Sequence, residues 1–150
     1  MAGFKMSEWI SRPPQDVFEF ITAPENAPRV VPTVKSMVTL TDGPIHVGTR
    51  YRETRVMRGK EEHAELEVVA YEPGQKYAVQ NLTEGIETVY QYAFRPEADG
   101  TRVDLLCDVK AGGAKKLLLP LVVAELRKED GDHLQRLKEL LEAEGAPGAR

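Results

Sequence analysis

The sequence predicts an α+β domain in which a curved antiparallel sheet of about seven strands wraps around a long C-terminal helix, with two short helices after the first strand. Three observations support this prediction. Residues 115–144 repeat apolar side chains at helical spacing, residues 49–110 form five runs typical of strands, and turn residues separate consecutive runs. Because short turns join antiparallel neighbours, the five runs form a meander, and the helix covers one of its faces.

Length and composition limit the possible functions. The chain has 150 residues, 41% of them hydrophobic and 29% charged, so we expect one domain over residues 1–145 and a flexible tail over 146–150. The net charge of −4 argues against a nucleic-acid partner. The single Cys107 excludes an intramolecular disulfide, and we expect it to be an inert core residue. With no apolar run that spans a bilayer and no leader, a cytoplasmic location is the default expectation.

The first forty residues alternate between strands and short helices. Residues 4–10 predict a strand, and the proline pair after it suits the first turn of a helix over residues 17–21. Three prolines between residues 24 and 32 limit the next helix to a brief turn at 25–31. Residues 34–40 predict the second strand.

The five central runs continue the sheet as a meander. They are residues 49–58, 61–72, 75–82, 86–96 and 101–110. The breaks between them, such as Pro73-Gly74 and Glu84-Gly85, suit hairpin loops of two or four residues.

Even-length loops allow the register to be followed from strand to strand. The predicted opposite pairs are Arg58–Glu61, Arg52–Glu67, Tyr51–Val68, Ala70–Tyr77, Val68–Val79, Val79–Tyr90, Tyr77–Tyr92, Phe94–Val103, Tyr92–Leu105 and Tyr90–Cys107. All four turns then place the apolar side chains on one face and the charged ones on the other. The cations between residues 50 and 60 are explained as solvated cross-strand pairs of Arg52 and Arg58 with glutamates.

Residues 115–144 predict a single amphipathic helix. The apolar residues that recur every three or four positions are Leu119, Val122, Val123, Leu126, Leu134, Leu137, Leu140 and Leu141. Pro120 suits the first turn, whereas Gly131 lies in the middle of the predicted helix. Asp130 and His133 continue the apolar row and should edge the buried stripe, while Glu129 falls on the solvated side.

Five segments of the sequence, in this order, resemble the START-like (SRPBCC) superfamily, in particular its polyketide cyclase/dehydrase and lipid-transport branch. They are ISRPPQDVFEFITAPENAPRVVPTV, VGTRYRE, YEPGQKYAV, YAFRPEADGTRV and LVVAELRKEDGDHLQRLKELLEAE. The resemblance covers nearly the whole chain and implies a helix-grip fold with a cavity between the sheet and the C-terminal helix. It also implies a hydrophobic ligand of lipid, polyketide or isoprenoid type. Val30 or Val31 stands where the family often has a tryptophan.

Polar and aromatic residues on the predicted apolar face are the candidate site residues. The candidates for acid–base catalysis are His133, Asp130, Glu53 and Arg55. The candidate ligand contacts are Tyr51, Arg55, Leu66, Val68, Tyr77, Val79, Asn81, Tyr90, Tyr92, Leu105, Val122 and Leu126. We expect no cofactor, and no metal because no three ligands have a suitable spacing.

Three functional hypotheses remain open from the sequence. The first is a carrier of one hydrophobic molecule, and this function needs a large and mainly apolar cavity. The second is a cyclase or dehydratase, and this function needs the four polar candidates to lie close together in the cavity. The third is an interaction module with a filled interior. We favour the carrier because the inward-facing residues are mostly apolar.

Residues 115–121 combine two lysines with an apolar patch, which suits a gate, a transient membrane contact or packing onto the sheet. Nothing in the sequence indicates an oligomeric state.

Overall fold

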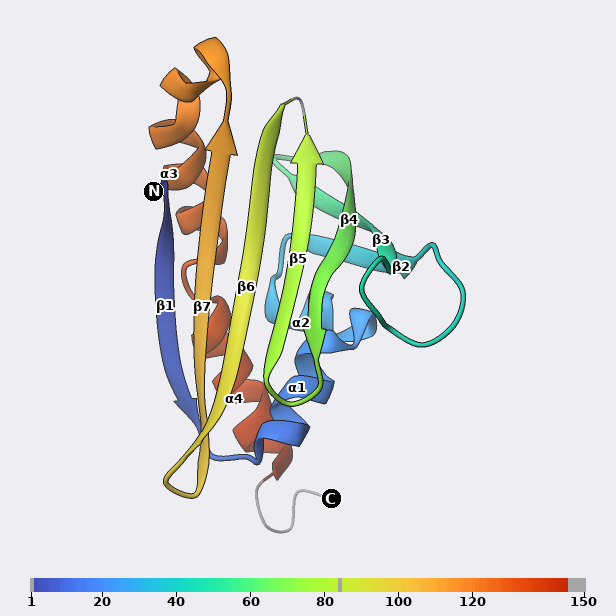
Figure 1. Ribbon diagram of the computed structural model, residues 1–150, viewed down its shortest axis with the longest axis vertical. Coiled ribbons are helices and arrows are strands. Elements are labelled where there is room, and N and C mark those ends of the chain that lie inside the picture. Colours follow the sequence, from blue (N-terminus) through green and yellow to red (C-terminus); the bar gives the residue numbers. More distant parts are fainter. Residues whose placement is uncertain (1, 84, 146–150) are drawn as a thin grey trace.

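Within residues 2–83 and 85–145, which the computed structural model describes, seven antiparallel strands form one sheet in the order β1-β7-β6-β5-β4-β3-β2 (Figure 1). The strands are β1 (Ala2–Ile10), β2 (Val34–Thr39), β3 (Arg50–Met57), β4 (Lys60–Glu72), β5 (Lys76–Thr83), β6 (Ile86–Glu97) and β7 (Gly100–Ala111). The predicted helix-grip class is confirmed. The tail predicted at 146–150 lies outside the described residues.

The helices lie together on one face of this sheet. They are α1 (Pro14–Thr22), η1 (Pro24–Asn26), α2 (Ala27–Val30), η2 (Gly113–Leu118), α3 (Leu119–Asp130) and α4 (His133–Gly145). Figure 1 shows α3 and α4 running behind β1 and β7, with α1 and α2 beside the lower part of the sheet. The proline pair predicted to begin the first short helix does so, since Pro14 lies in the first turn of α1. Pro28, which was predicted only to limit the length of the next helix, lies in the first turn of α2.

The predicted register is correct in the centre of the sheet and shifted at β3–β4. Tyr77 lies opposite Tyr92, and Tyr92 opposite Leu105, as predicted. The first hairpin turns at Arg58 and Gly59, both with positive φ, so Met57 pairs with Lys60. This moves the β3–β4 register by two residues, which leaves the side chains of these paired residues on their predicted faces.

Two sets of predicted pairs are therefore wrong. Tyr51 lies opposite Leu66, and the predicted pairs of Arg52 and Arg58 are replaced by the ion pairs Arg50–Glu65 (3.1 Å) and Lys35–Glu61 (2.7 Å). A bulge in β4 between Val68 and Ala70 places Ala70 opposite Ala78, and Tyr71 opposite Tyr77. The bulge turns Tyr71 towards Phe18 of α1, with ring centroids 5.4 Å apart.

The prediction of one continuous C-terminal helix is wrong, because α3 ends at Asp130 and α4 begins at His133. Gly131 permits the interruption, since a Cβ there would lie 2.4 Å from the backbone oxygen of Arg127. Asp132 starts the new helix, with its backbone oxygen accepting from the Arg136 amide at 3.0 Å. Pro120 lies in the first turn of α3, as predicted.

The two C-terminal helices pack on different parts of the sheet. Leu134, Leu137 and Leu141 of α4 are at most 2% exposed and join the main core, together with α1 and the lower part of the sheet. The α3 residues Val122, Val123 and Leu126 instead pack against a smaller cluster formed by Phe4, Cys107 and Val109. The interruption between the helices therefore lies between two packed regions.

Replacing Gly131 with alanine tests this interruption. In a continuous helix, Gly131→Ala would stabilise the protein by about 1 kcal/mol, because alanine has the higher helix propensity. Here the added methyl meets the Arg127 carbonyl, so we expect the variant to lose about 1–2 kcal/mol of unfolding free energy in urea denaturation. The control Glu125→Ala, at an exposed position of α3, should stay within about 0.5 kcal/mol of wild type. A stabilised Gly131→Ala would contradict the interruption.

Candidate functional site

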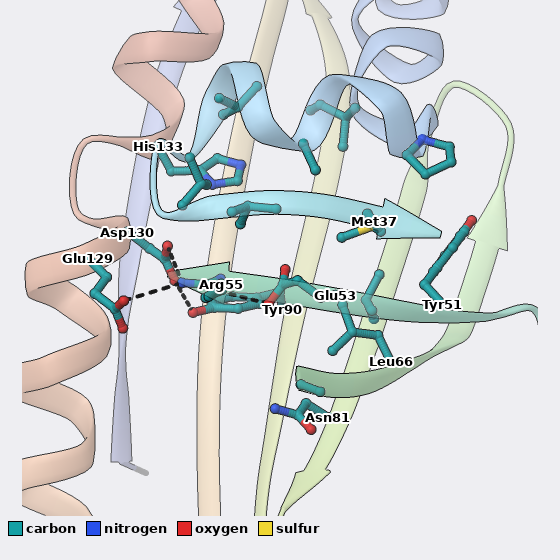
Figure 2. Close-up of a pocket in the computed structure, with 18 of the residues that line it drawn as sticks. Met37, Tyr51, Glu53, Arg55, Leu66, Asn81, Tyr90, Glu129, Asp130 and His133 are labelled. Carbon is teal, nitrogen blue, oxygen red and sulfur yellow. Dashed lines mark hydrogen bonds and ion pairs between the residues drawn. The ribbon is translucent and has the colours of Figure 1, made fainter. Parts of the chain in front are cut away.

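A cavity of about 310 Å³ lies between the concave face of the sheet, α1–α2 and the junction of α3 with α4 (Figure 2). Its volume is in the range of sites that bind small molecules. The helical side of its wall is largely apolar, with Phe20, Ile21, Ala27, Val30 and Val31. The sheet contributes apolar and tyrosine side chains, which are Val34, Met37, Met57, Ala64, Leu66, Val79, Tyr51, Tyr77, Tyr90 and Tyr92.

Most of the predicted ligand contacts line this cavity. They are Tyr51, Arg55, Leu66, Tyr77, Val79, Asn81, Tyr90, Tyr92 and Leu126. Val68 and Leu105 point inward as well, but they are at most 1% exposed within the main core, where α1 and α4 cover the sheet. Val122 packs against the cluster around Phe4 and Cys107. The alternation of side chains along the strands predicts which residues point inward. The packing of the helices determines which of these residues remain uncovered and line the cavity.

Arg55 of β3 is the centre of a charged cluster at one end of the cavity. Its Nε donates to Oε1 of Glu53 at 2.7 Å, and its Nη1 lies 3.5 Å from Oδ1 of Asp130 and 3.7 Å from Oε1 of Glu129 (Figure 2). Glu53 and Arg55 are two residues apart on one strand, so both point inward. Burial opposes the charge of Arg55, but Glu53 and Asp130 hold its pKa above the ordinary value. The guanidinium is therefore charged.

Two tyrosines of β6 link the sheet to the helix junction. The Tyr90 hydroxyl donates to Oδ2 of Asp130 at 2.5 Å, and the Tyr92 hydroxyl lies 3.0 Å from Nε2 of His133. Burial, followed by the negative charge of Asp130, raises the pKa of both tyrosines, so their hydroxyls keep their protons. Burial lowers the pKa of His133, although Asp130 acts against this shift. The imidazole is consequently neutral near pH 7.

The interruption of the helix explains why the polar candidates meet. Asp130 is the last residue of α3 and His133 the first of α4, and both line the cavity. Glu129, expected on the solvated side of a continuous helix, also lines it, with a side chain only 12% exposed. Burial raises the pKa of Glu129, and Arg55 partly offsets the effect. Gly131 is the sequence signal that could have indicated this change of direction.

Other candidate residues contribute less to the site. Burial raises the pKa of the fully buried Cys107 thiol to about 12, which makes it an inert thiol at neutral pH. Across residues 2–83 and 85–145, no group of three or more histidine, cysteine, aspartate or glutamate side chains could hold a metal ion.

In the same part of the chain, no helix has both the length and the apolar character needed to cross a bilayer. Leu117 and Leu121 of the apolar patch are 82% and 70% exposed.

A comparison with protein families supports the resemblance found in the sequence. A family profile described as "Polyketide cyclase / dehydrase and lipid transport" matches residues 1–142. The chain therefore belongs to this family. A comparison with the curated proteins found no match.

Solved structures share the fold at low sequence identity. The protein TTHA0849 from Thermus thermophilus is 20% identical with a TM-score of 0.74, and the match covers 95% of this chain and 98% of that one. A START superfamily protein from Mycobacterium smegmatis is 14% identical with a TM-score of 0.73, covering 93% and 96% of the two chains. The di-domain ARO/CYC BexL from the BE-7585A biosynthetic pathway is 18% identical with a TM-score of 0.79; the match covers 98% of this chain but 48% of that one.

The lowered pKa of His133 predicts a pH-dependent stability. As the pH falls below the ordinary histidine value of about 6.5, the unfolded chain takes up a proton that the buried imidazole does not. The free energy of unfolding should therefore decrease on acidification. The decrease should be smaller in the His133→Gln variant than in wild type. Urea denaturation at about pH 7.5 and about pH 5.5 measures the difference. An equal loss in wild type and variant would refute the assignment of a buried neutral imidazole.

Proposed function

We propose that the protein binds one hydrophobic small molecule in the cavity between the sheet and the helices, with the polar end of that molecule at the Arg55 cluster. The observation that supports this proposal is the division of the cavity wall. Apolar and aromatic side chains form most of it, and charged groups gather at the junction of α3 and α4. This arrangement suits an amphiphile bound in one orientation.

Apolar burial supplies the driving force for such binding. A ligand that loses about 200 Å² of apolar surface to the cavity gains about 5 kcal/mol before the cost of immobilising it is subtracted. The tyrosine hydroxyls and the charged cluster then fix its orientation. The cavity volume of about 310 Å³ argues against the third hypothesis, an interaction module with a filled interior.

A second function, acid–base catalysis, is favoured by the convergence of the polar candidates. Glu53, Arg55 and Asp130 meet in one cluster, and His133 lies beside Tyr92 on the same cavity. A neutral imidazole can remove a proton from a carbon next to a carbonyl, and the imidazolium that forms can donate that proton to a hydroxyl that leaves as water. These are the proton transfers of a cyclisation followed by dehydration.

Filling the cavity tests the binding proposal. Val79→Trp places an indole in the cavity wall, so the affinity for the uncharged fluorescent probe N-phenyl-1-naphthylamine should fall by at least about tenfold. The matched control is Val56→Trp on the same sheet, at a position that is 39% exposed, and it should bind the probe as wild type does. Fluorescence titration measures both affinities. Unchanged binding by Val79→Trp would place the ligand elsewhere.

The natural ligand can be sought on the protein itself. Native mass spectrometry of the purified protein should reveal a bound mass that is lost from Val79→Trp and kept by Val56→Trp. If the protein is an enzyme, incubating the extracted compound with wild type yields a product lighter by one water. Asp130→Asn and His133→Gln should then slow its formation while they still bind the compound. Binding without any conversion would leave the carrier function and exclude catalysis on that compound.

A further inference from the structure

We infer that the polar end of the cavity accepts a positively charged head group, so that the ligand is a hydrophobic amine or a similar organic cation rather than a carboxylic acid. This inference rests on the proposed function and specifies the chemistry of the ligand's polar end.

The first argument is the sign of the charge around the cavity. The carboxylates that line it are Glu53, Glu62, Glu129 and Asp130, whereas Arg55 is the one lysine or arginine that lines it within the described part of the chain. The two lining histidines, His63 and His133, add donors and acceptors, and His133 is neutral near pH 7 because burial lowers its pKa. The lining therefore holds more acidic than basic side chains, which disfavours a negatively charged ligand.

The second argument is that Arg55 is already engaged. Its Nε is used by Glu53 at 2.7 Å, and its Nη1 lies between Asp130 at 3.5 Å and Glu129 at 3.7 Å (Figure 2). A ligand carboxylate that approached Nε or Nη1 of this guanidinium would compete with carboxylates supplied by the protein. Displacing them would leave a buried charge without its partner, which is strongly unfavourable.

The third argument is that two buried oxygens of this cluster still lack a hydrogen bond. Oδ1 of Asp130 and Oε1 of Glu129 are buried and accept no hydrogen bond from the part of the chain that the structure describes. The Asp130 side chain is only 3% exposed, and its other oxygen accepts from Tyr90. Both oxygens lie near Nη1 of Arg55, at 3.5 and 3.7 Å, but accept no hydrogen bond from it. Buried acceptors without hydrogen bonds are costly, so a ligand that brings donors into this region relieves the cost.

The geometry allows one head group to serve both oxygens. Each lies within 3.7 Å of the same nitrogen of Arg55, and both residues line the cavity. A protonated amine has three donors and a positive charge, so it can contact both carboxylates and compensate the excess negative charge of the cluster. The apolar wall formed by Leu66, Val79 and the α2 residues then covers the body of the ligand.

A matched series of ligands tests the charge preference. The three compounds carry a naphthalene ring on a two-carbon chain that ends in an amine, a hydroxyl or a carboxylic acid, and calorimetric titration of the full chain near neutral pH gives their affinities. We expect the amine to bind about tenfold tighter than the alcohol, and the acid to bind more weakly than both. An acid that binds as tightly as the amine overturns the inference.

A charge-removing variant then connects the preference to the cluster. Glu129→Gln keeps the shape of the side chain but removes one carboxylate, so it should weaken amine binding about fivefold and leave alcohol binding unchanged. Alcohol binding also reports that the variant is folded. Glu139→Gln removes a carboxylate from α4, away from the cavity lining, and should change neither affinity. Equal loss of amine affinity in both variants would mean that only the net charge of the protein matters, which contradicts the inference.

The outcomes separate this inference from the proposed function. If the alcohol or the acid binds in the cavity as well as the amine, and Val79→Trp abolishes that binding, the cavity is a ligand site without a preference for cations. If none of the three compounds binds, both the inference and the proposed function fail.

Discussion

The interruption of the C-terminal helix at Gly131 and Asp132 is the constraint on which the site depends. A straight helix would carry its apolar stripe along the whole sheet and keep Glu129 in solvent. The interruption instead lets α4 pack into the main core with α1, and α3 against the cluster around Phe4. Between these two packed regions neither helix fills the concave face, so the cavity remains there, lined by the residues at the helix ends.

The charged cluster at this junction is expected to reduce the stability of the folded protein. Ions taken out of water are unfavourable unless each is paired, and replacing such groups with apolar residues is often neutral or stabilising. Here a single guanidinium serves three carboxylates, and two of their oxygens lack hydrogen bonds within the described residues. A site that only held the fold together would be better paired. The incomplete pairing supports the proposal that the polar end of a ligand binds here.

Membership of the polyketide cyclase/dehydrase and lipid-transport family sets the range of functions without choosing among them. The solved structures with the same fold are at most 20% identical in the three comparisons described above, so they support the fold alone. Function must be argued from the cavity of this chain. Its apolar walls favour binding, and the contact of Tyr92 with His133 beside the Arg55 cluster supplies groups that acid–base chemistry requires.

The sequence by itself determined the sheet and its inward face, because strand alternation and even hairpin loops are local properties. The pairs of Tyr77 with Tyr92 and of Tyr92 with Leu105 follow from turn positions alone. The two-residue shift at Arg58–Gly59 and the bulge between Val68 and Ala70 do not follow from turn positions, because the turn can be placed at more than one residue pair and a bulge lies within a strand. Only the tertiary structure decided which inward residues are covered and that Glu129 joins Asp130 in the cavity. Covering depends on how helices distant in sequence share one surface, and a periodic pattern in the sequence carries no information about that.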